Sequence, residues 1–172
     1  MAQTGLDSFD RTLHETHVWL KELMEDLGTD DRHRAYRLLK AVLHALRDRV
    51  TPVEAAQFGA QLPMLIRGFY YEGWRPIVVP LSMRTHAEFL DHIEKSVEDL
   101  RRHDPDLDVE AATVAVFRVI SRHVSAGEVQ DILGQLPRDI RRLWPEDALA
   151  EAPDRMRSEE RRVGKECFLL CR

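Results

Sequence analysis

The chain has 172 residues, of which 44% are hydrophobic and 32% are charged, and its formal net charge is −5 at pH 7. This apolar content excludes disorder of the whole chain, and the apolar runs are too short to span a bilayer. The acidic balance argues against nucleic-acid binding, because that function needs a basic surface. The amino terminus has neither a basic start nor an apolar stretch, so we expect a cytoplasmic protein without a secretion signal.

The first half of the chain has apolar residues three and four positions apart, the spacing of amphipathic helices. The first such stripe comprises Leu13, Leu20, Leu23, Met24 and Leu27. Gly28 closes it, and Asp30 or Asp31 can cap a long second helix. The capping box Thr51-Pro52-Val53-Glu54 predicts the start of a short third helix. Pro63 ends that helix and opens a fourth short one.

The second half of the chain repeats this punctuation after a linker over residues 75–84. Ile77-Val78-Val79 lies between two prolines in this linker and predicts an extended segment that covers a seam. Thr85-His86-Ala87-Glu88 is a capping box, and the helix after it carries the stripe Phe89, Ile93, Val97 and Leu100. Asp106 or Asp108 can cap the next long helix, and Ser125-Ala126-Gly127-Glu128 opens another short one.

An internal duplication explains this recurrence. Gln61-Leu62-Pro63 recurs 74 residues later as Gln135-Leu136-Pro137, and the apolar stripes align at the same offset. We therefore predict an all-α fold of two pseudo-repeats, each with about four helices, two long and two short. The pseudo-repeats cover residues 8–74 and 85–149, and they pack into one helical bundle unit because either alone would have a marginal core. Together they form a single domain over residues 1–156.

The last sixteen residues differ in character from the rest. Residues 157–172 lack the spacing of a helix or a strand, and residues 157–167 resemble the translation of a common sequencing adapter. We interpret residues 157–172 as a non-native or disordered tail. Both cysteines, Cys167 and Cys171, lie in it, so the rest of the chain offers no disulfide or thiolate ligand.

Several long motifs carry a resemblance to a known family. They are Thr16-His17-Val18-Trp19-Leu20-Lys21, Arg32-His33-Arg34-Ala35-Tyr36, Leu46-Arg47-Asp48-Arg49, the segment from Gln61 to Trp74, and Gln135-Leu136-Pro137 with Leu143-Trp144-Pro145. Over about residues 9–146 the chain resembles the bacterial domain of unknown function 2267 (DUF-2267). The resemblance implies an all-helical, cytoplasmic, bacterial protein. It implies no activity, cofactor or catalytic residue.

An aromatic cluster gives the first candidate site. Tyr71 and Trp74 directly follow Phe69 and Tyr70, and the second pseudo-repeat has only Pro145 and Ala148 at the positions equivalent to Tyr71 and Trp74. These two rings either plug the seam between the pseudo-repeats or form an exposed anchor for a protein partner.

Arginine and histidine give two further candidates. Arg47 and Arg49 end the second helix, where they complement the helix dipole or join Arg67 in an anion-binding patch between the repeats. His14 and His17 lie on one side of a helix and can share a metal ion, although the sequence identifies no third ligand. Solvated or capping histidines are the alternative.

The sequence contains no phosphate-binding loop, nucleophile elbow or paired-carboxylate motif. We therefore assign no catalytic residue and no cofactor. The leading hypothesis is a non-enzymatic interaction or scaffold module with a protein partner. A small-ligand or anion-binding protein and a histidine-mediated metal-binding protein are the alternatives, and the oligomeric state is left open.

Overall fold

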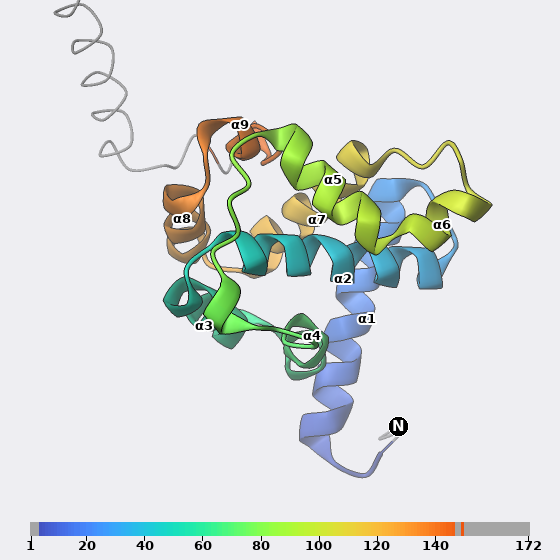
Figure 1. The fold of residues 1–172 in the computed structure, drawn as a ribbon. Helices are drawn as coiled ribbons and strands as arrows, with labels where there is room; N and C mark the ends of the chain where they lie inside the picture. The colour runs from blue at the N-terminus through green and yellow to red at the C-terminus, as the bar shows by residue number, and fades with distance from the viewer. Residues whose placement is uncertain (1–3, 147–148, 150–172) are drawn as a thin grey trace, which may run out of the picture.

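The computed structural model describes residues 4–146 and residue 149, and this part of the chain is helical and contains no strand (Figure 1). The helices are α1 (Asp7–Leu27), α2 (Arg32–Arg49), α3 (Pro52–Gln61), α4 (Met64–Tyr70), the 3-10 turn η1 (Pro76–Val78), α5 (His86–Ser96), α6 (Glu98–His103), α7 (Val109–His123), α8 (Ala126–Gln135) and α9 (Arg138–Arg141). The all-α prediction is confirmed. Residues 157–172, with both cysteines, lie outside the described residues.

Local capping signals set most helix boundaries. The side chains of Asp31 and Asp108 accept hydrogen bonds from the first-turn N–H groups of α2 and α7, and Thr51, Thr85 and Ser125 do the same for α3, α5 and α8. These bonds satisfy donors that the helix itself leaves unpaired. Gly28 ends α1 in the left-handed region, with φ of 61°.

One continuous core holds the helices together. Helix α1 packs against α2 and α7, α2 also contacts α5, and α3 meets α8, so elements from both halves of the chain interleave. Leu38 and Leu46 of α2 and Ile120 of α7 are all at most 1% exposed. Each such side chain contributes about 1.5–3 kcal/mol through its burial. Within the described residues, none of the helices has the length and apolarity needed to cross a lipid bilayer.

The predicted order of helices recurs, although the duplication itself stays a prediction. A long helix followed by two short ones occurs first as α2, α3 and α4 and again as α7, α8 and α9. The single helix expected over residues 86–100 is divided into α5 and α6. At the division, Val97 leaves the helical region with φ of −121°, and its side chain is fully buried in the core.

The linker differs from the expected extended segment. Pro76–Val78 forms a 3-10 turn in which the Val78 N–H donates to the carbonyl of Arg75 at 3.1 Å. Ile77 is 89% exposed, so its side chain does not cover a seam. The chain returns to the body at Leu81, whose N–H donates to the Asp48 carbonyl at 2.7 Å. A proline at the start of a turn favours this tighter conformation because its φ is already restricted.

Candidate functional site

The aromatic pair Tyr71 and Trp74 forms a half-buried cover over α3. The two ring centroids are 5.2 Å apart, and the Tyr71 hydroxyl donates to the carbonyl of Ala56 at 3.4 Å. A Cβ atom placed on Gly59 would lie 2.2 Å from that hydroxyl oxygen, so the ring depends on glycine beneath it. The rings pack against the core, and the contacts of Tyr71 are with α3 in the same half of the chain.

Arg47 is a buried structural cation. Its side chain is 4% exposed, and its guanidinium donates to the carbonyl of Tyr70, the last residue of α4, and to the carbonyl of Glu72 just beyond it. It also donates to the Asp48 carboxylate at 2.7 Å. Through these bonds from Nε and Nη1, Arg47 joins the end of α2 to the end of α4, and its burial keeps it away from a surface ligand.

The other two arginines of the expected patch have different surroundings. Arg49 donates from Nε to the carbonyl of Met83 at 2.7 Å, and burial lowers its pKa. Arg67 lies on α4 and lines a cleft against α1. Among the described residues, neither Arg47 nor Arg49 lines the cleft beside Arg67. Of the three arginines, Arg67 is therefore the one that lines the cleft.

Half of the eight histidines contact a residue on another helix. His44 of α2 lies 2.6 Å from the carbonyl of Phe69, and burial lowers its pKa, so the neutral form is favoured there. His14 and His17 are both exposed on α1. Within the part of the chain that the structure describes, no group of three or more ligand-type side chains converges on a metal position.

A glutamine from the second half of the chain completes the cap of α3. Gln135 Nε2 donates to the Glu54 carboxylate at 3.0 Å, and its Oε1 accepts from the Thr51 N–H at 2.9 Å. Glu54 is 6% exposed. Burial, followed by the charges of Asp131 and Glu128, raises its pKa. This bridge takes the place of the capping-box bond in which the Thr51 N–H would donate to the Glu54 carboxylate.

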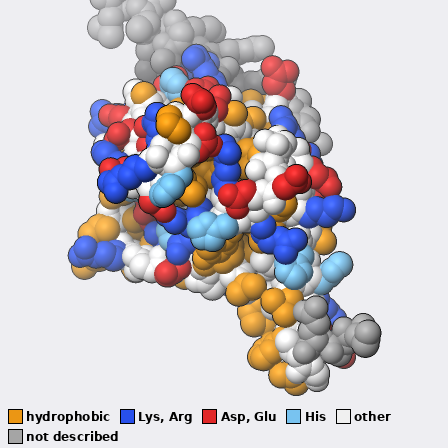
Figure 2. All heavy atoms as spheres, turned by 90° about the vertical axis from the view of Figure 1, so that its right-hand side faces the viewer, with side chains coloured by type: hydrophobic (Ala, Val, Ile, Leu, Met, Phe, Trp, Pro, Cys, Tyr) orange, Lys and Arg blue, Asp and Glu red, His pale blue; other side chains and the backbone are white. Residues whose placement is uncertain are grey.

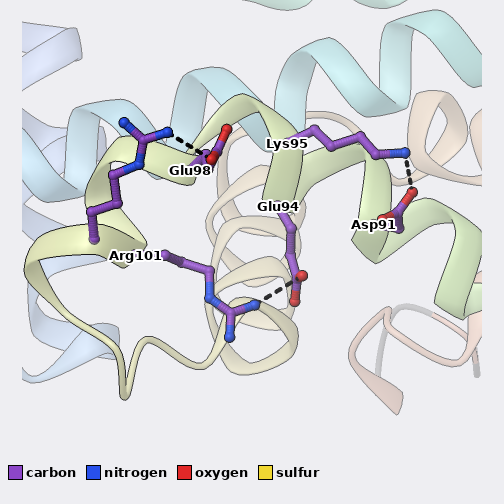
Figure 3. A pocket seen from close by; sticks show the side chains of 6 residues that line it. Asp91, Glu94, Lys95, Glu98 and Arg101 are labelled. Carbon is purple, nitrogen blue, oxygen red and sulfur yellow. Dashed lines mark hydrogen bonds and ion pairs between the residues drawn. The ribbon is translucent and has the colours of Figure 1, made fainter.

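A hollow of about 360 Å³ lies over α5 and α6 and is lined by charged side chains (Figure 3). Lys95 pairs with Asp91 at 2.5 Å, Arg101 with Glu94 at 2.8 Å and Arg102 with Glu98 at 2.7 Å. The three cations and three carboxylates neutralise one another. This hollow therefore offers no unbalanced charge to a ligand, and exposed pairs of this kind contribute little to stability.

An exposed apolar face occurs where α1 projects beyond the other helices (Figure 1). Leu6 and Phe9 are 53% and 48% exposed, and Met64 and Leu65 at the start of α4 are 50% and 43% exposed. The Leu65 N–H donates to the Thr12 hydroxyl at 2.9 Å, which holds the start of α4 against α1. Figure 2 shows hydrophobic side chains gathered over this projecting end. We call Leu6, Phe9, Met64 and Leu65 the apolar face.

A cleft of about 370 Å³ adjoins the apolar face. Its lining includes Glu15 and Trp19 of α1, Gln61 at the end of α3, and Met64 and Arg67 of α4. Trp19 is 2% exposed and stacks on His123 with ring centroids 5.0 Å apart. His123 is in turn 3.1 Å from the Glu22 carboxylate. The cleft thus has a firmly held aromatic wall and several polar groups at its rim.

These features define an all-helical protein with two neighbouring surface sites, the apolar face and the cleft. The chain belongs to the family described as "Uncharacterized conserved protein (DUF2267)", whose model matches residues 16–143. The resemblance drawn from the sequence motifs is therefore confirmed. A comparison with curated proteins found no match. Leu6 and Phe9 precede the matched region, whereas Met64, Leu65 and most of the cleft lie within it.

Proposed function

We propose that this protein is a non-catalytic interaction module that binds an α-helix of a partner chain through its apolar face. The observation that carries the proposal is the exposure of four large apolar side chains on two adjacent helices. Large exposed apolar patches with polar surroundings mark interaction sites on protein surfaces. The proposal places the partner at the tip of α1 and not at Tyr71 and Trp74, because those rings already cover α3.

The pattern along α1 specifies a helix as the partner. Its apolar stripe runs at alternating steps of three and four residues through Leu6, Phe9, Leu13, Thr16, Leu20, Leu23 and Leu27. The middle of the stripe, at Thr16, Leu20 and Leu23, is buried by neighbouring helices. The stripe begins at Leu6 and Phe9, which no other described helix covers. A helix with its own apolar stripe completes such a seam by inserting side chains between these residues.

The size of the apolar face indicates a weak and reversible complex. Complete burial of one large apolar side chain contributes about 1.5–3 kcal/mol, and each of these four is already about half buried. The face therefore supplies about 3–6 kcal/mol by itself. Association costs at least about 4 kcal/mol, so flanking contacts are needed for measurable affinity. Covalent capture is the appropriate assay for a complex of this strength.

A photocrosslinking amino acid placed at position 9 tests the proposal in the native cell. We expect an adduct whose partner peptide, identified by mass spectrometry, comes from an amphipathic helix. The adduct should disappear when Leu65→Glu is added, because that change places a charge in the same face. The control is the same crosslinker at position 77, a residue that is 89% exposed and does not belong to the face. Equal adducts from positions 9 and 77, or none from position 9, would contradict the proposal.

A further inference from the structure

We infer that the cleft between α1, α3 and α4 binds a small zwitterion, a molecule with a carboxylate, an ammonium group and an apolar side chain. This inference goes beyond the proposed function and starts from other observations, although Met64 belongs to both the cleft and the apolar face. It starts from three polar side chains at the rim of the cleft: Glu15, Gln61 and Arg67. Among the described residues, none of these three has a hydrogen bond or an ion pair.

The lack of pairing between Glu15 and Arg67 is the central observation. Both line the same cleft and both are partly buried, yet no ion pair joins them. Other opposite charges on this protein do pair, as Arg34 does with Asp104 and Arg122 with Glu22. Glu15 and Arg67 thus line one cleft without pairing with each other. A ligand that carries both charges satisfies both residues at once.

The balance of charge at the cleft selects against simple ions. Inorganic phosphate placed near Arg67 would also meet the negative charge of Glu15. A metal cation near Glu15 would meet the guanidinium of Arg67. A carboxylate suits Arg67, whose planar guanidinium can donate two parallel hydrogen bonds. The Gln61 amide can add a further donor to that carboxylate.

The walls of the cleft suit an apolar side chain of modest size. Trp19, Leu62 and Met64 line it, and the stacking of Trp19 on His123 holds the indole in place. A volume of about 370 Å³ is near the lower end for small-molecule sites. This volume accommodates a ligand of amino-acid size. A preformed wall also lowers the cost of ordering the site on binding.

Calorimetric titration with three related probes tests the inference. L-leucine carries both charges, N-acetyl-L-leucine lacks the ammonium group and L-leucinamide lacks the carboxylate. We expect L-leucine to bind at least about tenfold more tightly than either derivative, because each derivative leaves one cleft residue unpaired. L-methionine and L-phenylalanine extend the test to other apolar side chains. The inference is wrong if L-leucine, L-methionine and L-phenylalanine all fail to bind at about 10 mM. It is also wrong if both derivatives bind as tightly as L-leucine.

Two variants test which cleft residue binds the carboxylate of the ligand and which binds its ammonium group. Arg67→Met should abolish the preference for L-leucine over L-leucinamide, and Glu15→Gln should abolish the preference over N-acetyl-L-leucine. Both variants should keep the wild-type melting temperature, because neither residue has an internal partner to lose. The matched control is Arg75→Met, which removes an exposed arginine outside the cleft and should leave all three affinities unchanged. If both cleft variants still bind L-leucine more tightly than the two derivatives, the roles given to Arg67 and Glu15 are wrong.

Discussion

Replacement of Arg47 by methionine distinguishes a structural cation from a ligand-binding one. The side chain is 4% exposed and donates to two carbonyls and to the Asp48 carboxylate. Hydrogen bonds from a charged donor contribute about 1.5–3 kcal/mol each. Methionine keeps much of the packing volume but supplies no donor. We therefore expect Arg47→Met to lower the free energy of unfolding by about 3–5 kcal/mol, as removal of one partner from a buried ionic network does.

The assay is urea unfolding followed by far-ultraviolet circular dichroism, with Arg67→Met as the matched control. Arg67 has the same charge and lies on α4, but it has no internal partner among the described residues. Its replacement should change the free energy of unfolding by no more than about 0.5 kcal/mol. A cost below about 1 kcal/mol for Arg47→Met, or equal costs for the two variants, would refute the structural role assigned to Arg47.

Four further substitutions test other parts of the structure. Ile120→Ala removes a fully buried side chain and should cost about 2–5 kcal/mol in a urea titration. Gly59→Ala places a Cβ atom against Tyr71, so the near-ultraviolet circular dichroism should change while the helical signal is retained. Glu54 has a raised pKa in the folded protein. The wild type therefore loses stability as the pH rises from the pKa of Glu54 in the unfolded chain through its pKa in the folded protein. Glu54→Gln should therefore be more stable than the wild type at pH 7.5, and the gain should shrink toward pH 4.5. His44 has a lowered pKa, so wild-type stability should fall as the pH drops below about 6.5, and His44→Gln should lack this part of the loss.

One control variant and three contradicting outcomes apply to these four substitutions. Asp30→Asn removes an exposed carboxylate and should not reproduce the effect of Glu54→Gln. A cost below about 0.5 kcal/mol for Ile120→Ala would mean that α7 is not in the core. An unchanged near-ultraviolet spectrum for Gly59→Ala would mean that the Tyr71 ring does not lie over that glycine. Stability profiles parallel to the wild type from pH 7.5 to 5 would contradict the role assigned to His44.

Helix boundaries were predictable because their causes are local. The caps at Asp31, Thr51 and Ser125 depend on a side chain and a backbone N–H only a few residues away. The burial of Leu23 and Ile93 followed from helical spacing alone. The division at Val97 was not predictable in this way, because the apolar spacing continues through it. Only packing of the whole fold decides that the helix is interrupted there.

The candidate sites were harder to predict because they depend on contacts between distant segments. Arg47 has the sequence features of an exposed helix end, yet α4 covers it. The bridge from Gln135 to Glu54 joins residues 81 positions apart. The apolar face had a usable signal, since Leu6 and Phe9 extend the stripe of α1 toward the amino terminus. Its exposure could not be foreseen, because the sequence does not tell where α1 leaves the bundle.

Amide hydrogen exchange on α1 tests the central claim most directly. The purified protein is compared alone and with the helical peptide that photocrosslinking at position 9 identifies. The account predicts slower exchange over residues 7–15 and at the start of α4, with no change around Tyr71 and Trp74. Protection confined to the Tyr71 and Trp74 region, or no protection of residues 7–15, would contradict it.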